Sequence, residues 1–318
     1  MKKPNPLKHG DTIRLIAPSS PPKDRASLEI AISALKTLGF RVKYSDAIFG
    51  RTGYLAGSDE DRARDFERAF ADDNAKAVLC VRGGYGSTRI LDLVGWDSIQ
   101  QPKVFLGFSD ITALSCALWK MCEIPSFSGP VLMSDLVGNK PDSVTWDHAL
   151  SLVTGERRNG PLLSEPFNLS HTIALVAGES HGRLMGGNLA MICSLVGTRW
   201  FPDFKKSILF LEDVGEGPYR VDRYLTQLTN AGILEQVSGI VLGDFRYSDS
   251  QRKNDKQQGL QTMEDVFQER LSGLGVPVLM NLPFGHIKPK ITLPFGTLVI
   301  LDGEKRNLFL QESSVQQA

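Results

Sequence analysis

Charge of one sign does not prevail in this sequence, because 36 lysine and arginine residues balance 36 aspartate and glutamate residues. A chain without net charge has no electrostatic footprint for nucleic acid or an anionic membrane, so we expect a small molecule as its partner. The sequence also lacks an apolar run long enough to cross a bilayer. Its first residues, Met1 to Pro6, lack the apolar stretch of a signal peptide. These absences predict a soluble, cytoplasmic protein that binds neither nucleic acid nor a membrane.

Cysteine and histidine are scarce, with four and five residues respectively. The cysteines form no C-x-x-C pair and lie in apolar stretches, so we expect reduced core residues and neither a disulfide framework nor a zinc site. No set of histidine, cysteine and acidic residues has metal-ligand spacing such as H-E-x-x-H. A P-loop and a strand-linked G-x-G-x-x-G are also missing. We therefore expect no metal and no cofactor.

A chain of 318 residues is long for one core and predicts two domains. In its first half, strand and helix patterns alternate. The expected strands cover residues 12–17, 40–44, 77–81 and 104–106, and the expected helices cover residues 28–38, 58–71, 87–94 and 111–121. This alternation is typical of an α/β fold with a parallel sheet, right-handed crossovers and ligand sites at the carboxyl ends of the strands.

The pattern loosens after a helix expected over residues 146–153. A polar, glycine-containing run at 155–161 predicts a linker, which we take as residues 156–180, between domains of residues 1–155 and 181–318. The second domain mixes both element types. We expect helices over 188–196, 221–228 and 263–271, strands over 207–211, 239–243 and 276–280, hairpin strands over 291–301 and 308–311, and a polar surface loop over 245–260.

Ser109 occupies the junction of two elements in the run Val104–Thr112. Val104 to Leu106 are apolar and predict a buried strand, whereas helical spacing begins after Asp110. A serine on such a turn can be the nucleophile of an elbow, with its hydroxyl above the sheet and the next backbone N–H aimed at a reacting oxygen. The G-x-S-x-G pattern is absent, and a helix N-cap is a very common role for a serine there. By itself the run favours the cap.

His286 is the histidine whose sequence context favours chemistry. It follows an expected buried strand in a glycine-rich turn, where a loop can project a side chain from the edge of a sheet. A loop histidine bonded to the backbone is the more common structural role, so the residue alone does not decide. By contrast, we expect His148 on the surface of a helix.

Two further features lie at the ends of expected strands. Glu212 closes the strand 207–211 and is either a solvated charge or a site residue, with Asp213 and Glu216 as competitors. The glycines of the Arg-Gly-Gly-Tyr-Gly run at 82–86 could offer backbone N–H groups to an anion, or they could form a tight turn without a ligand. Because both this run and Ser109 follow strands of one parallel sheet, they can converge.

Several longer motifs follow one another at compatible spacings along nearly the whole chain. They are Leu15-Ile16-Ala17-Pro18-Ser19, Leu55-Ala56-Gly57-Ser58-Asp59-Glu60-Asp61-Arg62, Val81-Arg82-Gly83-Gly84-Tyr85-Gly86-Ser87-Thr88-Arg89, Gly107-Phe108-Ser109-Asp110-Ile111-Thr112, Phe127-Ser128-Gly129-Pro130, Gly186-Gly187-Asn188-Leu189, Leu211-Glu212-Asp213 and Phe284-Gly285-His286. With these motifs the chain resembles the serine LD-carboxypeptidases, a family that includes murein tetrapeptide carboxypeptidases and microcin C self-immunity hydrolases. The resemblance implies a Rossmann-like N-terminal domain, a smaller C-terminal domain of mixed strands and an active site in the cleft between them.

The resemblance also implies a Ser-Glu-His triad, which falls on Ser109 as the nucleophile, Glu212 as the orienting carboxylate and His286 as the general base. It implies an oxyanion hole from the backbone N–H of Asp110 and from that of a glycine in the 82–86 run. We assign the second donor to Gly84, with the preceding glycine as the alternative. Neither a metal nor a cofactor enters this scheme.

The substrate implied by the resemblance is a cytoplasmic muropeptide tetrapeptide of peptidoglycan recycling, cut between the L-centre of its diamino acid and the terminal D-alanine. Such a substrate ends in a free carboxylate and calls for a cation near the cleft. Arg82, Lys288 and Lys290 are candidates by their proximity to site loops, although such residues are usually surface charges. A homodimer is a further expectation from the family.

Two alternative functions stay open on the sequence. One is the same hydrolase acting on a peptide-nucleotide or aminoacyl-adenylate antibiotic, which would need aromatic stacking surface. The sequence offers little of it, with Met185 before the Gly186-Gly187 pair and Trp200 as the nearest tryptophan. The other alternative is a non-catalytic two-domain protein that binds a small ligand and needs no serine–histidine pairing.

Overall fold

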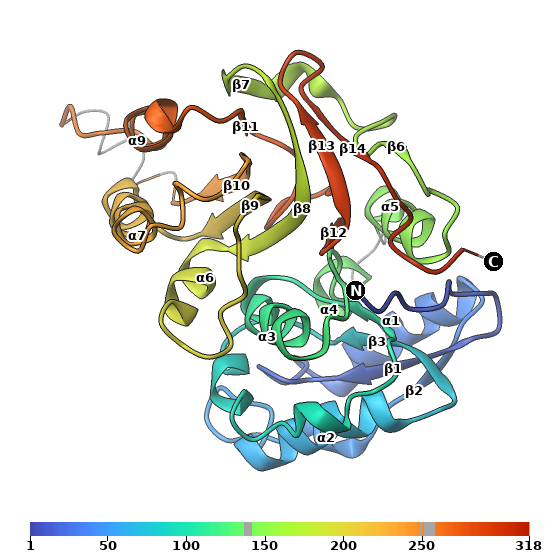
Figure 1. The fold of residues 1–318 in the computed structure, drawn as a ribbon. Helices are drawn as coiled ribbons and strands as arrows, with labels where there is room; N and C mark the ends of the chain where they lie inside the picture. Colours follow the sequence, from blue (N-terminus) through green and yellow to red (C-terminus); the bar gives the residue numbers. More distant parts are fainter. Residues whose placement is uncertain (137–141, 249, 251–257, 318) are drawn as a thin grey trace.

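The computed structural model describes residues 1–136, 142–248, 250 and 258–317, and within these residues it has two β-sheets with flanking helices (Figure 1). The first sheet has the strand order β12-β5-β4-β3-β1-β2. Its strands are β1 (Thr12–Ile16), β2 (Arg41–Lys43), β3 (Ala75–Cys80), β4 (Val104–Leu106), β5 (Ser126–Ser128) and β12 (Leu293–Phe295). Strands β1 to β5 are parallel, as predicted, but β12 is antiparallel to β5. The predicted parallel sheet is therefore confirmed for β1 to β5, and the unpredicted strand β12 makes one edge of it antiparallel.

The helices on the first sheet are α1 (Arg25–Thr37), α2 (Asp59–Ala71) and α3 (Thr112–Cys122), and of these α1 and α2 begin at a side-chain cap. The side chain of Asp24 accepts a hydrogen bond from the Ser27 N–H, and the Ser58 side chain accepts one from the Asp61 N–H, so both caps satisfy otherwise unpaired donors. In Figure 1, α3 lies between the first sheet and the second, whereas α2 lies on the far side of the first sheet.

The second sheet has the order β6-β14-β13-β8-β9-β10-β11-β7 and is mixed, as predicted. Its strands are β6 (Gly160–Pro161), β7 (Ile173–Val176), β8 (Glu179–Asn188), β9 (Ser207–Val214), β10 (Gly239–Arg246), β11 (Val278–Met280), β13 (Leu298–Asp302) and β14 (Asn307–Leu310). The other helices are α4 (Leu132–Asp135), α5 (Ser143–Val153), α6 (Leu189–Leu195), α7 (Pro218–Asn230) and α9 (Met263–Leu271). Strands β8 to β11 are parallel, so their carboxyl ends meet at one edge. Strands β6 and β7 lie in the stretch 156–180, which therefore contributes to this sheet.

The C-terminal hairpin differs from its prediction. The sequence predicts one strand over residues 291–301, but the chain forms β12 and then β13, which pairs with β14 and β8. Gly296 separates the two strands with a φ of +89°, and a Cβ there would overlap the Trp119 ring. Glycine adopts this left-handed conformation without steric cost. The chain thus returns to the first sheet before it completes the second.

Two predicted loop-region elements also differ in the structure. The helix predicted over residues 87–94 is a single 3₁₀ turn, Ser87–Ile90, in which the N–H and hydroxyl of Ser87 donate to Asp110. The surface loop predicted over 245–260 begins later, since β10 continues to Arg246. Within that loop, residues 249 and 251–257 lie outside the described part of the chain.

The core contradicts one prediction about histidine. His148 is 5% exposed rather than on a helix surface. Its Nε2 donates to the Leu162 carbonyl, and its Nδ1 accepts from the Thr292 N–H. Burial is the main cause that lowers the pKa of His148 to about 4. The buried imidazole therefore satisfies one backbone carbonyl and one backbone N–H.

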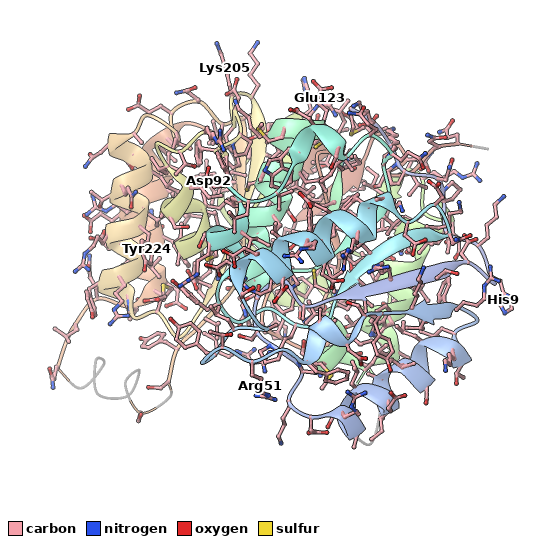
Figure 2. The ribbon with its side chains drawn as sticks, turned by 90° about the horizontal axis from the view of Figure 1, so that it is seen from below. His9, Arg51, Asp92, Glu123, Lys205 and Tyr224 are labelled. Carbon is pink, nitrogen blue, oxygen red and sulfur yellow. The ribbon has the colours of Figure 1, made fainter. Side chains whose placement is uncertain are left out.

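Side chains sort by polarity over the rest of the molecule. Charged residues such as Arg51, Glu123 and Lys205 extend from the surface (Figure 2). All four cysteines are buried and unpaired, as the sequence predicts. Among the helices of the described residues, none is long and apolar enough to cross a membrane.

Candidate active site

Ser109 lies on the tight turn between β4 and α3, as the sequence predicts. Its backbone φ is +66°, a left-handed conformation that costs a non-glycine residue about 1–3 kcal/mol and often marks a functional site. Gly107 permits the turn, because a Cβ there would lie 2.7 Å from the Ile111 side chain. Among the described residues, no side-chain hydrogen bond caps this helical turn or α3. The capping interpretation of Ser109 is therefore wrong.

The side chains of Ser109, His286 and Glu212 form one hydrogen-bonded chain. His286 Nε2 lies 3.1 Å from Ser109 Oγ, and His286 Nδ1 lies 2.6 Å from Glu212 Oε2. Because an ionised carboxylate only accepts, Nδ1 carries the proton of a neutral imidazole and Nε2 is free to accept from the serine hydroxyl. Glu212, on β9, is 3% exposed at its side chain, against 20% for His286. This geometry can move a proton from Ser109 to His286.

The imidazole of His286 is held on two sides. Gly285 has a φ of +102°, and a Cβ there would lie 2.8 Å from Glu212 Oε2, so only glycine lets the turn approach the carboxylate this closely. On another side, the Phe108 ring packs against the imidazole with centroids 4.8 Å apart. The ring is thereby restricted to an orientation that faces Ser109.

Two glycines of the 82–86 loop lie beside the serine. A Cβ on Gly83 would be 3.1 Å from Ser109 Cβ and 3.3 Å from its Oγ. Gly84 has a φ of +111°, and a Cβ there would overlap the Ser20 hydroxyl. A side chain would therefore crowd the loop at both positions, against Ser109 at Gly83 and against Ser20 at Gly84. Both glycines line the cavity at Ser109, which keeps each of them a candidate donor to an oxyanion.

Asp110 fixes the loops around Ser109 through its side chain. Its Oδ2 accepts from Ser19 Oγ at 2.5 Å and from the Ser87 N–H at 2.8 Å, while its carbonyl accepts from Ser87 Oγ at 2.5 Å. The residue is 3% exposed. Sequence reasoning used only the backbone of Asp110 and missed Ser19 and Ser87. Their positions after the first and third strands of the sheet are the signal that could have identified them.

A cavity of about 440 Å³ opens at Ser109. Its lining combines backbone of the glycine loop with apolar side chains and two cations. The residues that line it are Lys23, Ser27, Arg82, Gly83, Gly84, Phe108, Ser109, Val131, Met133, Ser134 and His286. Among these described residues there is no carboxylate, so Arg82 and Lys23 give the cavity a positive character.

Of the three cations proposed from the sequence to bind the substrate carboxylate, one lines the cavity at Ser109 and two do not. Arg82 lines the cavity at Ser109. Lys288 lies outside that lining and donates from Nζ to the Ser134 carbonyl. Lys290 is buried and forms an ion pair with Asp135. Lys23, which precedes α1, was not predicted, because nothing in its local sequence relates it to a serine so much further along the chain.

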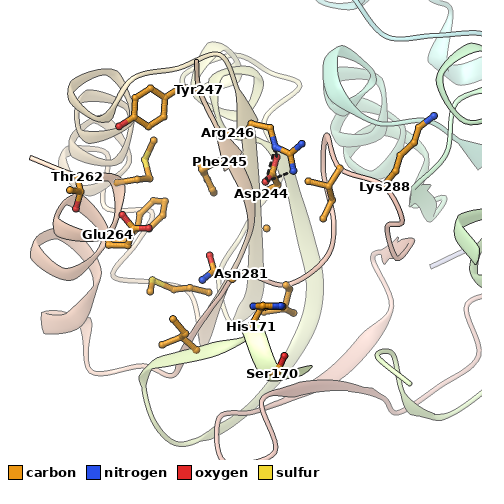
Figure 3. Close-up of a pocket in the computed structure, with 17 residues that line it drawn as sticks. Ser170, His171, Asp244, Phe245, Arg246, Tyr247, Thr262, Glu264, Asn281 and Lys288 are labelled. Atoms are coloured by element: carbon orange, nitrogen blue, oxygen red, sulfur yellow. Dashed lines mark hydrogen bonds and ion pairs between the residues drawn. The ribbon is translucent and has the colours of Figure 1, made fainter. Parts of the chain in front are cut away.

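A second, larger cavity of about 870 Å³ lies at the carboxyl ends of β10 and β11 (Figure 3). The first turn of α9 closes one side of it. Its lining residues are Ser170, His171, Ile173, Gly243, Asp244, Phe245, Arg246, Tyr247, Thr262, Met263, Glu264, Phe267, Met280, Asn281, Leu282, Ile287 and Lys288. None of these described residues also lines the cavity at Ser109. Within the described part of the chain, no group of three or more histidine, cysteine or acidic residues is placed to hold a metal ion.

Comparison with known proteins identifies the family. The model of the LD-carboxypeptidase N-terminal domain matches residues 13–129, and that of the LD-carboxypeptidase C-terminal domain matches residues 181–301. The chain belongs to the LD-carboxypeptidase family. One relative in this family is a protein of Bacillus subtilis named "Probable murein peptide carboxypeptidase", which is 34% identical over 97% of this chain and 94% of its own length.

Solved structures of the family share the whole fold. A muramoyltetrapeptide carboxypeptidase from Oxalobacter formigenes superposes with a TM-score of 0.78 at 32% identity, over 94% of this chain and 97% of that one. The microcin C7 self-immunity protein MccF, in complex with aspartyl sulfamoyl adenosine, superposes with a TM-score of 0.88 over 99% and 100% of the two chains. At 24% identity, this second likeness concerns the fold alone.

Proposed function

We propose that this member of the LD-carboxypeptidase family is a serine peptidase that releases the terminal D-alanine from muropeptide tetrapeptides, a reaction of peptidoglycan recycling. The observation that carries the proposal is the hydrogen-bonded chain from Ser109 through His286 to Glu212, with distances of 3.1 and 2.6 Å. A nucleophile, a base and a carboxylate that orients the base are the parts that acyl transfer needs.

The mechanism follows from the roles of these three groups. His286 Nε2 takes the proton of Ser109 Oγ as the oxygen attacks the carbonyl carbon of the L,D-peptide bond. The backbone N–H of Asp110 and that of Gly83 or Gly84 stabilise the oxyanion. The imidazolium, paired with Glu212, then protonates the leaving D-alanine nitrogen as its bond to the acyl carbon breaks. In the second half-reaction, His286 takes a proton from a water that attacks the acyl carbon, and it returns that proton to Ser109 Oγ as the ester bond breaks.

Two cations support an exopeptidase over an endopeptidase. A carboxypeptidase must hold the free carboxylate of the residue that leaves, and Arg82 and Lys23 line the cavity at Ser109. Among the described residues, neither side chain has an ion-pair partner. A guanidinium can bind a carboxylate through two parallel N–H···O bonds, and an ammonium adds a point charge. We assign the substrate carboxylate to these two residues.

The aromatic content of the cavity favours a peptide over a nucleoside. A purine base needs a flat aromatic face on which to stack. Besides the His286 imidazole, Phe108 is the aromatic ring among the described residues that line this cavity. One face of that ring is taken by Lys290, whose Nζ lies 4.0 Å from the ring centroid. We therefore expect the chain to cleave aspartyl sulfamoyl adenosine poorly in comparison with a muropeptide.

The decisive experiment measures D-alanine released from a synthetic muropeptide tetrapeptide by the wild-type chain and by Ser109→Ala. We expect turnover by the wild type and a loss of at least about 10³-fold in kcat in the variant, since triad members act as a unit. Ser151→Ala, at a half-buried serine of α5, is the matched control and should keep full turnover. No D-alanine release by the wild type, or near-full turnover by Ser109→Ala, would contradict the proposal. In the first case, a serine-directed phosphonate that leaves Ser109 unmodified would favour a non-catalytic binding protein.

A further inference from the structure

The cavity at β10 and β11 lies directly beyond the catalytic histidine. Ile287 and Lys288 line this larger cavity, and in the sequence they follow His286, which lines the cavity at Ser109. One turn of the chain therefore contributes to both cavities.

The turn that carries His286 is anchored from both sides. On the side of the larger cavity, the Asp244 N–H donates to the Phe284 carbonyl at 3.0 Å. On the other side, Lys288 Nζ donates to the carbonyl of Ser134, a residue in the wall of the cavity at Ser109. The first bond joins backbone to backbone and the second joins a side chain to backbone, so both cavities keep a fixed position relative to the imidazole.

The two cavities differ in what they can accept. The cavity at Ser109 measures about 440 Å³ and carries the cations Arg82 and Lys23, which suits one residue with a free carboxylate. The cavity beyond His286 measures about 870 Å³, so it is the larger of the two. Its position at the carboxyl ends of parallel strands is where α/β folds commonly bind ligands.

The lining of the larger cavity suits a peptide. One part of it is apolar, with side chains that include Met263, Phe267 and Met280. Polar groups are present too, and Figure 3 shows the imidazole of His171 and the amide of Asn281 among the lining side chains. Among the described residues, neither of these two side chains has a hydrogen-bond partner, so both can bond to peptide N–H and C=O groups.

We propose that this larger cavity binds the acyl part of the substrate, that is, two or more peptide residues on the N-terminal side of the bond that Ser109 attacks. The inference rests on the proposed function and extends it to the length of peptide that the enzyme selects. The leaving residue occupies the cavity of Arg82 and Lys23, and the remaining peptide passes the turn of His286 and lies across the ends of β10 and β11. His171 and Asn281 are substrate-binding residues in this arrangement.

The test compares a full tetrapeptide with an N-acetylated dipeptide made of its last two residues. Besides the leaving residue, the dipeptide places only one residue and its acetyl group in the larger cavity, so the wild type should cleave the tetrapeptide with a higher kcat/KM. The double variant His171→Ala/Asn281→Gly removes both polar side chains, and glycine accepts the left-handed φ of +61° at position 281 without strain. We expect kcat/KM for the tetrapeptide to fall about tenfold, through KM, because two hydrogen bonds are lost. The kcat/KM for the dipeptide should change far less.

His181→Ala is the matched control, because His181 is an exposed histidine of the same sheet that lines neither cavity. A parallel fall for both substrates in the double variant, or an unchanged tetrapeptide value, would overturn the inference. Equal cleavage of dipeptide and tetrapeptide by the wild type would overturn it as well and leave the proposed function intact. Release of D-alanine from neither peptide would remove the proposed function, and the inference with it.

Discussion

Lys290 and Asp135 form an ion pair of 3.0 Å in which their side chains are only 3% and 0% exposed. Asp135 also accepts a hydrogen bond from the Val131 N–H, in the wall of the Ser109 cavity. Lys290 lies against Phe108, the ring that packs on His286. The ion pair therefore joins the segment that follows His286 to the segment of Val131 in the cavity wall. A buried pair of this kind is costly to break, because the remaining charge has no partner.

We predict that Lys290→Met lowers the free energy of unfolding by about 3–5 kcal/mol, since it leaves the Asp135 carboxylate buried and unpaired. The double variant Lys290→Met/Asp135→Asn should recover part of that loss, because it removes both charges and keeps an amide oxygen for the Val131 N–H. Urea titrations of the single and double variants give the coupling energy. Losses that simply add in the double variant would show that the two side chains do not interact.

The carboxylate of Glu212 should matter through the orientation of His286. In Glu212→Gln, the side-chain amide can donate to Nδ1, which favours the tautomer with a proton on Nε2 and leaves no acceptor for the Ser109 hydroxyl. We expect kcat to fall by about 10³–10⁴-fold with little change in KM. Glu304→Gln, in the exposed turn between β13 and β14, is the matched control. Steady-state kinetics in which Glu212→Gln behaves like the control would exclude this role.

Arg82 and Lys23 should bind the free carboxylate of the substrate. We predict that the wild type cleaves a tetrapeptide acid much faster than the corresponding C-terminal amide, and that Arg82→Met/Lys23→Met brings the two kcat/KM values together. The change should fall mainly on the KM of the acid, because binding and not chemistry is affected. Lys8→Met, at an exposed lysine outside the cavity lining, is the control. Persistence of the preference for the acid in the double variant would rule out these two cations.

His148 should make stability depend on pH on the acid side. Its pKa is about 4 in the folded chain against the ordinary 6.5, so between these values the unfolded chain binds more protons than the folded one. This group therefore withdraws stability as pH falls from 6.5 to 4, by roughly 3 kcal/mol in total. Asp213, whose pKa burial raises to about 6, acts in the opposite sense, since it gains stability as pH falls through 6.

The contribution of His148 is therefore measured as a difference. In the wild type, His148 contributes up to about 1.4 kcal/mol per pH unit to the slope of the unfolding free energy against pH between 6.5 and 4. We expect this contribution to be absent in His148→Gln. Urea unfolding at several pH values gives both slopes, and His181→Gln, at an exposed histidine, controls for a change of histidine content. Equal slopes in His148→Gln and the wild type would mean that this histidine is not the titrating group.

Local patterns in the sequence predicted the elements that carry the candidate site. The apolar run of β4 and the helical spacing of α3 placed Ser109 on a turn, because both patterns are properties of a few neighbouring residues. The same local patterns did not predict strand β8. Its glycines lower strand propensity, yet the sheet requires them: a Cβ on Gly182 would overlap the Lys206 carbonyl, and one on Gly186 would overlap that of Phe210. A glycine-rich strand therefore looks like a loop in the sequence.

The sequence by itself determined the alternation of strands and helices, the buried cysteines and, through its motifs, the residues proposed as nucleophile, base and orienting acid. The tertiary structure decided that β12 returns to the first sheet, that His148 is buried, that Lys23 joins Arg82 and that Lys290 pairs with Asp135. Each of these depends on groups far apart in the chain, whose approach is set by how the two sheets and their loops pack. Local propensity and periodicity carry no information about that packing, because they describe residues within a few turns of each other.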